Sequence, residues 1–237
     1  MDTQTRHALK QDQFVLAATS GVEWLGEHRN SVIRWSIVAV LVIGALVAGI
    51  VVYQNRTAAA DRLLGQAMDI YQTPLTQPGQ PTAPGDKTYA TAAERARAAN
   101  PIFRQAADRY GWLRAGEMAR YFAGITELDM GQQANAEADL EKASHSHGSS
   151  LAALAKMALA NAYLQSGKTS QAVSVFQDLI RHPTTTVPKS EAQLQLAQLY
   201  ETTNQPGEAR RIYAQIKDQD KGSQAAQIAT QKLQSLK

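Results

Sequence analysis

The hydrophobic pattern begins with one long apolar run near the N-terminus. From Ile37 to Tyr53 there are 17 residues without a charge, and extension back to residue 32 adds Arg34 as the only ionised side chain. A helix of about 20 apolar residues is long enough to cross the hydrocarbon core of a bilayer. Trp35 and Tyr53 stand at the two borders, where interfacial aromatic residues are common. The run therefore predicts a transmembrane helix over residues 32–54.

Two other interpretations compete with a membrane span. A buried core helix would carry a polar face at its edges, and this run carries none. A cleaved signal peptide is possible in principle because Ala58, Ala59 and Ala60 offer small residues to a peptidase. However, the run is longer than the usual apolar region of about 7–15 residues and follows an unusually long leader. A retained span is the interpretation we favour.

The charges beside the span favour an N-terminus in the cytoplasm by a small margin. Arg29 and Arg34 lie before or at the start of the span, with Arg6 and Lys10 further upstream, whereas Arg56 and Arg62 follow it, so the positive-inside bias is weak. We predict a single-pass protein of a bacterial inner membrane with its C-terminal domain in the periplasm. Residues 1–31 predict a short amphipathic cytoplasmic segment, whose apolar residues are Phe14, Val15, Leu16, Val22, Trp24 and Leu25.

Small residues form two overlapping pairs within the span. Gly44 with Ala48, and Ala45 with Gly49, are four positions apart, a spacing that lets a second membrane helix approach closely. Small residues are also common in spans that bind no partner. The four residues are therefore candidates for helix packing within the membrane.

Beyond the span, the spacing of apolar residues over positions 55–73 predicts the first helix of a soluble domain, with one apolar face. Residues 74–89 follow, and they place four prolines within eleven residues. Proline interrupts a helix and cannot donate a hydrogen bond to a sheet. This stretch predicts an exposed loop that is neither helical nor paired.

Residues 90–237 repeat one pattern of small and large apolar residues. Alanines recur at intervals of 37, 36 and 37 residues, and each is followed by apolar residues four and seven positions later. These positions share one face of a helix. The triplets are Ala99, Phe103, Ala106; Ala136, Leu140, Ala143; Ala172, Phe176, Leu179; and Ala209, Tyr213, Ile216.

A second helix is expected before each of the last three triplets. Small residues mark it twelve positions before each alanine, at Gly124, Ala160 and Ala197. The turns between paired helices need a residue that tolerates left-handed geometry. Gly131, Gly167 and Asn204 occupy those positions.

These residues resemble the tetratricopeptide repeat, a two-helix unit in which small residues let paired helices approach. The third unit follows the motif at Leu159, Ala160, Tyr163, Gly167, Ala172, Phe176 and Pro183, and the fourth at Leu196, Ala197, Tyr200, Ala209 and Tyr213. The second unit departs from it, with Glu127 in place of the tyrosine and Leu140 in place of the aromatic residue. The first unit has its leading helix displaced across the proline loop. A final helix near residues 222–236 is expected to cap the open end.

The order of the segments resembles a narrower group, the YfgM family. Its members are periplasmic repeat proteins associated with the SecYEG translocon and with periplasmic chaperones. The resemblance covers nearly the whole chain and lies in its layout: a cytoplasmic leader, one span, a first helix, a loop and divergent repeats. It implies an all-α fold with one transmembrane helix followed by a tetratricopeptide-like solenoid.

The sequence offers little sign of catalysis. It has no cysteine, which excludes disulfides and thiolate chemistry. His145 and His147, with His182, are the one candidate metal group, and we interpret them as loop and helix-end residues. The acidic residues are scattered singly at spacings typical of helix surfaces. We expect no enzymatic activity, no cofactor or metal, and no nucleic-acid or small-molecule partner.

The net charge of +3 draws attention to one run of arginines. The run comprises Arg95, Arg97, Arg104, Arg109, Arg114 and Arg120. Its simplest interpretation is a set of solvated helix faces. Contact with anionic lipid headgroups is the alternative.

What remains is a surface for protein partners. In a solenoid of helix pairs, the first helices line the concave side. The repeat register places these residues toward it: Tyr121, Ile125 and Leu128; Met157, Asn161 and Leu164; Leu194, Gln198 and Glu201. Apolar and amide side chains of this kind suit an extended or helical peptide, although each could instead pack inside the solenoid.

Two functions remain open at this point. The first is an accessory factor at the Sec translocon or in periplasmic chaperone networks, which would meet SecYEG, chaperones or unfolded chains. The alternative is a structural or assembly scaffold in another envelope membrane complex. Repeats supply a surface without naming its ligand.

Overall fold

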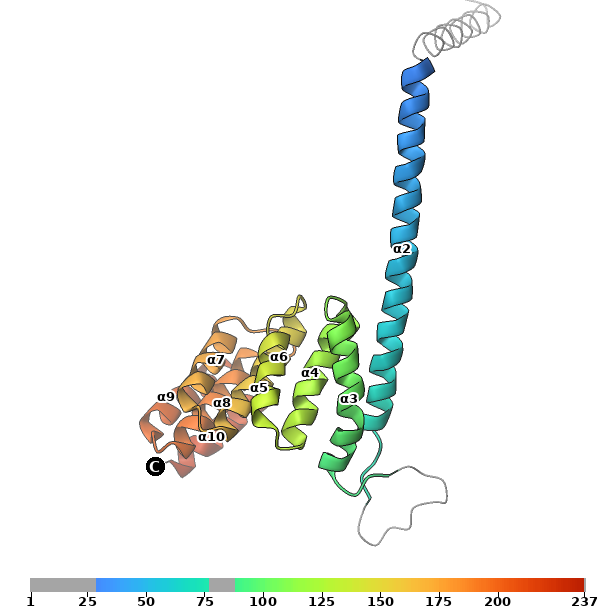
Figure 1. Ribbon diagram of the computed structural model, residues 1–237. Helices are drawn as coiled ribbons and strands as arrows, with labels where there is room; N and C mark the ends of the chain where they lie inside the picture. The colour runs from blue at the N-terminus through green and yellow to red at the C-terminus, as the bar shows by residue number, and fades with distance from the viewer. Residues whose placement is uncertain (1–28, 77–87, 237) are drawn as a thin grey trace, which may run out of the picture. The chain divides into compact units, whose positions relative to one another are not determined.

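The computed structural model describes residues 29–76 and 88–236 (Figure 1). Most of the predicted cytoplasmic segment, and the centre of the proline-rich loop, lie outside the described residues. The chain divides into two compact units, Met1–Asn55 and Arg56–Lys237. The described elements are all α-helices, which confirms the predicted fold class.

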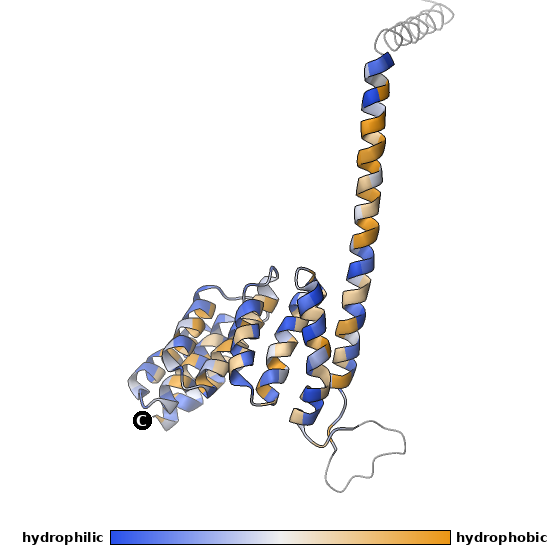
Figure 2. Cartoon of the chain, viewed as in Figure 1, coloured by the Kyte–Doolittle hydropathy of each residue, from blue (hydrophilic) through white to orange (hydrophobic). Residues whose placement is uncertain are grey.

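Helix α2 (Arg29–Tyr71) contains the apolar run. Figure 2 shows this run as an almost unbroken hydrophobic stretch. Its large apolar side chains are exposed, from Val38 at 46% to Trp35 at 73%. Among the described residues, α2 is the one helix that is long and apolar enough to cross a membrane.

The second unit is a stack of antiparallel helices (Figure 1). Each helix from α3 onward packs against the next one in the chain, and α4 also touches α6, as α8 touches α10. The helices are α3 (Ala92–Tyr110), α4 (Arg114–Asp129), α5 (Gln133–Ala143), α6 (Ser149–Gln165), α7 (Thr169–Arg181), α8 (Lys189–Thr202), α9 (Pro206–Gln219) and α10 (Gln224–Ser235). The pairs α4–α5, α6–α7 and α8–α9 are the repeat units, and α10 closes the stack.

The four triplets of small and large apolar residues form the interior of the stack. All four triplets are buried, and none of their residues is more than 2% exposed. Gly124 shows why a small residue is needed on the facing helix. A Cβ atom added there would lie 2.6 Å from Cγ of Leu140. The backbones of α4 and α5 can therefore pack this closely only because Gly124 has no side chain.

The predicted left-handed turns are present. Gly131 and Gly167 adopt φ values of +73° and +72°, and Asn204 adopts +58°. Each ends the first helix of a pair, where glycine or asparagine pays little steric cost for this geometry. The same turn recurs in all three units, which keeps the helix pairs in one register.

The C-terminal part of α2 supplies the first helix of the first unit. Ala67 is buried in one cluster with Ala99 and Phe103 of α3. The ring of Tyr71 meets Phe103 edge-on at a centroid distance of 6.2 Å. Its hydroxyl donates to Asp129 at the end of α4 over 3.3 Å. The displaced leading helix expected from the sequence is thus residues 56–71.

The two ends of the proline-rich loop pair with each other, so the expectation that this stretch is unpaired is wrong at its ends. Leu75 and Tyr89 form an isolated parallel β-bridge. The amide of Thr76 donates to the carbonyl of Tyr89 over 2.8 Å. Proline blocks only its own amide, so the residues beside the prolines keep their donors.

The interpretation of the arginine run as solvated faces is wrong for Arg95 and Arg120, which are partly buried, whereas Arg104 is exposed. Arg120, with a side chain only 17% exposed, bridges Asp139 at 3.1 Å and Asp108 at 3.3 Å. Arg104 pairs with the fully buried Glu127 at 2.9 Å. Arg95 lies over the ring of Tyr71. Each of these three cations has a partner within the first two repeats, which weakens the alternative of a lipid-binding patch.

Candidate partner-binding groove

Two adjoining hollows lie on the face that the first helices form. The first, about 590 Å³, lies between α4 and α6. The second, about 640 Å³, lies between α6, α8 and α10. Leu154 lines both. We call the two hollows together the groove.

Side chains in the groove recur with the period of the repeats. Met118, Leu154, Glu191 and Ile228 follow one another at intervals of 36, 37 and 37 residues, and each lines one of the hollows or both. The same helical position in α4, α6, α8 and α10 therefore builds the groove. On α4 this position lies one turn before Tyr121, which packs between the repeats.

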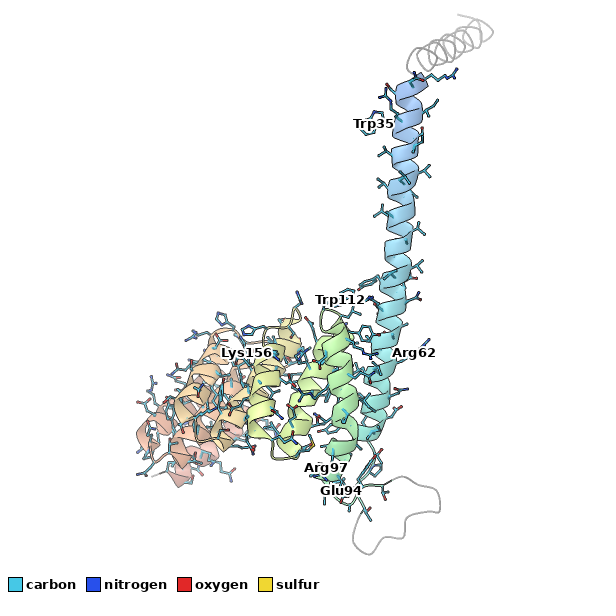
Figure 3. All side chains as sticks on the ribbon, viewed as in Figure 1. Trp35, Arg62, Glu94, Arg97, Trp112 and Lys156 are labelled. Atoms are coloured by element: carbon cyan, nitrogen blue, oxygen red, sulfur yellow. The ribbon has the colours of Figure 1, made fainter. Side chains whose placement is uncertain are left out.

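The first hollow combines apolar side chains with Arg114 and with Glu117, an acid that already has a hydrogen-bond partner. Met118, Leu151 and Leu154 line it, and Trp112, 55% exposed, joins them from the turn between α3 and α4 (Figure 3). Glu117 accepts a hydrogen bond from the backbone amide of His147 over 3.1 Å and lies 2.5 Å from Nδ1 of its ring. The carboxylate is thus already occupied by its neighbour.

The second hollow combines apolar side chains with two acids. Leu154, Met157, Leu194 and Ile228 are among its lining residues. Glu191 and Asp220 also line it, and none of the described residues that line it is a lysine or an arginine. The two ends of the groove therefore differ in charge.

The predicted groove residues on α4 pack largely inward. Tyr121, Ile125 and Leu128 lie against a cluster that includes Leu140 and Leu159. The ring of Tyr121 also meets Phe122 edge-on at 5.1 Å, and burial raises the pKa of its hydroxyl. These three residues are part of the packing between repeats and do not line either hollow.

The predicted residues on α6 and α8 divide into four kinds. Met157 and Leu194 line the second hollow, while Leu164 packs against the core. Asn161 and Gln198 are exposed. Glu201 is paired with Lys232 of α10 over 2.9 Å, which ties the capping helix to the last repeat. The predicted row therefore meets the groove at Met157 and Leu194, whereas its members on α4 pack between the repeats.

A larger hollow of about 820 Å³ lies outside the groove, between α6, α7 and the segment that leads to α8. Lys156, labelled in Figure 3, lines it. Its ammonium donates to Asp178 over 2.7 Å, and this hydrogen bond holds the pKa of the Asp178 carboxyl below its usual value. The main cation of this hollow is thus already neutralised.

The candidate metal histidines lie apart, each beside its own carboxylate. His145 is 3.5 Å from Glu141, and His182 is 3.1 Å from Asp178. His147 belongs to the Glu117 pair described above. In the described part of the chain, no three histidine, cysteine or acidic residues gather closely enough to hold a metal ion.

The small residues of the apolar run lie on open surface of α2. A Cβ atom added at Gly44 or Gly49 would meet no atom within 4 Å. Ala45 and Ala48 are exposed as well. These four positions therefore remain candidates for contact with another helix.

Comparison with known proteins identifies the repeats. A family model described as "Tetratricopeptide repeat" matches residues 121–184 and 157–224. No curated protein matches the sequence. Among solved structures, the putative kinesin light chain of Podosopora anserina, with nearly identical TPR-like repeats, matches at 15% identity and a TM-score of 0.55, covering 76% of this chain and 86% of that one.

A variant of the same Podosopora anserina protein matches with the same identity and TM-score, and 85% of it is covered. At this identity the likeness concerns the fold alone. Tetratricopeptide repeats are generally interaction scaffolds, which makes this chain a protein–protein interaction module by its repeats. Residues 121–224 are tetratricopeptide repeats, and the unit that contains them is a TPR-like helical-repeat solenoid.

Proposed function

We propose that the protein is a membrane-anchored interaction module of the bacterial envelope, whose groove binds a segment of a partner protein. The observation that carries this proposal is the row of side chains with the repeat period along the first helices. A groove lined by apolar residues with a few polar ones is the usual form of a peptide site. Its walls are rigid helices, so little order has to be gained on binding.

The anchor is the apolar run of α2. Its side chains are exposed over the whole stretch, a state that costs free energy in water at about 25 cal/mol per Å² of apolar surface. A bilayer removes that cost. The repeats would then be held close to the membrane and would meet partners there.

The partners we propose are the protein-export machinery and the chaperones that receive emerging chains. The support is the layout of the chain, which resembles the YfgM family, together with a groove of a size suited to peptide segments. The groove would contact soluble chaperones or unfolded chains, and the small residues of α2 would contact an integral-membrane subunit such as those of SecYEG.

Site-specific photo-crosslinking in cells tests the proposal. A photoreactive amino acid at Met157 or Asn161 reports on the groove side, and one at Gln177, exposed on α7, serves as the matched control. We expect export subunits or periplasmic chaperones to crosslink from the first two positions and not from the third. A different stoichiometric complex would favour the scaffold function instead. Equal crosslinking from all three positions would remove the groove as the binding site.

Protease accessibility tests the anchor and its orientation. Protease added to spheroplasts is expected to digest the chain beyond Arg56 and to spare the N-terminal segment. An intact C-terminal domain under these conditions would overturn the periplasmic location.

A further inference from the structure

The carboxylates of the second hollow have no cationic partner among the described residues, in contrast to four acids elsewhere in the repeats. Glu117 lies beside His147, and Glu201 beside Lys232. Glu137 is paired with Lys168, and Asp178 with Lys156. By contrast, no cation of the described residues lies within ion-pair distance of Glu191 or Asp220.

The neighbouring lysines do not change this picture. Lys189 donates to Gln219 over 3.3 Å. Lys221 lines a separate hollow beside α10. The one side-chain partner of Glu191 is the neutral amide of Gln195, at 3.1 Å. The two negative charges therefore remain available to a ligand.

Apolar side chains from three helices line the hollow together with these charges. Met157 comes from α6, Leu194 from α8, and Ile228 from α10. Met157 and Ile228 are only partly buried. A ligand that covers them places its next residues beside Glu191 or Asp220. An acidic ligand would be repelled there, and a neutral one would leave both carboxylates uncompensated.

We propose that the second hollow selects an apolar peptide segment that carries lysine or arginine, with Glu191 and Asp220 as the residues that determine specificity. The inference rests on the proposed function, because it names the partner class for the same groove. The basic residues lie at the α8–α10 end. Apolar side chains continue past Leu154 toward Met118 in the first hollow, where Glu117 is already paired.

Peptide binding to the full chain in phosphatidylcholine nanodiscs tests the inference. The probes are three fluorescent peptides with one leucine–alanine–serine core and two lysines, two serines or two glutamates at one end. The neutral lipid avoids attraction of the lysine peptide to the membrane. Fluorescence anisotropy gives the dissociation constants, and low and moderate salt are compared because screening weakens exposed charge pairs.

The lysine peptide is expected to bind most tightly. Glu191→Gln with Asp220→Asn should weaken it about tenfold, since each charge pair near the surface contributes a few-fold. The serine peptide should hardly change. The reversal Glu191→Lys with Asp220→Lys should prefer the glutamate peptide, a gain that a misfolded variant could not produce. Glu208→Gln with Asp218→Asn, on the exposed side of α9, is the matched control and should change nothing.

The outcomes separate the two proposals. If Met157→Ser with Ile228→Ser abolishes binding of all three peptides while the charge variants keep wild-type preferences, the groove stands and the basic selectivity is wrong. If wild-type protein binds the three peptides equally, the selectivity is likewise refuted. If no peptide binds, or the Met157 and Ile228 changes have no effect, the groove itself is not the site.

Discussion

The substitution Gly124→Ala tests the closest approach between paired helices. The added Cβ would lie 2.6 Å from Cγ, 2.9 Å from Cδ2 and 3.3 Å from the backbone nitrogen of Leu140. Carbon atoms in contact are normally about 3.5–4.0 Å apart. The leucine must therefore leave its fully buried position, or α4 and α5 must separate.

Two opposing contributions set the expected size of the effect. Replacing glycine by alanine within a helix stabilises by about 0.5–1 kcal/mol. Overpacking a core costs about 1–3 kcal/mol. We expect Gly124→Ala to lower the free energy of unfolding by ~1–2 kcal/mol. Gly65→Ala on α2 is the matched control, because no atom lies within 4 Å of its added Cβ, and it should stabilise.

Urea unfolding of the full chain in detergent, followed by circular dichroism, measures the difference. With a denaturant slope of about 2 kcal/mol/M, the midpoint should fall by roughly 0.5–1 M. In a Leu140→Ala background the obstructing side chain is gone, so Gly124→Ala should become neutral or stabilising. An equal loss in both backgrounds would refute the proposed contact, as would a stabilisation like that of Gly65→Ala.

Three further outcomes follow from the structure. Burial, with a smaller effect of Asp139, raises the pKa of Glu127 to about 6 from an ordinary value of 4.5. The folded state then binds the proton more tightly than the unfolded state, so this carboxyl adds ~2 kcal/mol to the free energy of unfolding below about pH 4.5, and this contribution is lost as the pH rises through 6. In Glu127→Gln the urea midpoint should therefore fall less between these pH values, and a pH dependence equal to that of wild type would contradict the raised pKa. Phe176→Ala, at a fully buried position, should cost about 3–5 kcal/mol in the same assay, and a urea midpoint equal to that of wild type would contradict the packing. Gly44→Leu with Gly49→Leu should remove an integral-membrane partner from gentle-detergent co-purification while peptide binding by the groove is kept; full recovery of that partner would exclude this face of α2.

The sequence predicts the interior of the repeats well because close packing leaves few choices. Two backbones can pair closely only where one side chain is missing, so Gly124 and the alanines in equivalent positions reveal the register. Left-handed turns likewise restrict residue type, and Gly131 and Asn204 reveal where helices end. Both restrictions act within one unit and are visible in its residue types.

The pairing of charges could not be predicted from the sequence. Arg104 and Glu127 are 23 positions apart, and Arg120 and Asp139 are 19 apart. Nothing in the spacing singles out these partners among all the charged residues. An arginine also has a long apolar stem, so the same residue type suits an exposed face and a buried pair.

The predicted groove residues include Met157 and Leu194 but not the periodic row that begins at Met118, although the repeat period of that row is visible in the sequence. The row through Met118 and Ile228 has the same period as the buried alanines. It is also one turn away from the predicted row that includes Tyr121. An apolar face of a helix is wide enough to include both rows, so residue type alone does not say which row packs inward.

The β-bridge between Leu75 and Tyr89 also makes the fold tolerant of changes in chain length. It joins the two ends of the segment between α2 and α3, so a change in the length of the intervening segment leaves the pairing residues themselves unchanged. Doubling the length of a loop costs only about 0.6 kcal/mol of closure entropy. An epitope or a small fluorescent label could therefore be inserted between residues 77 and 87. Homologous chains could likewise gain or lose residues there while the repeats keep their register.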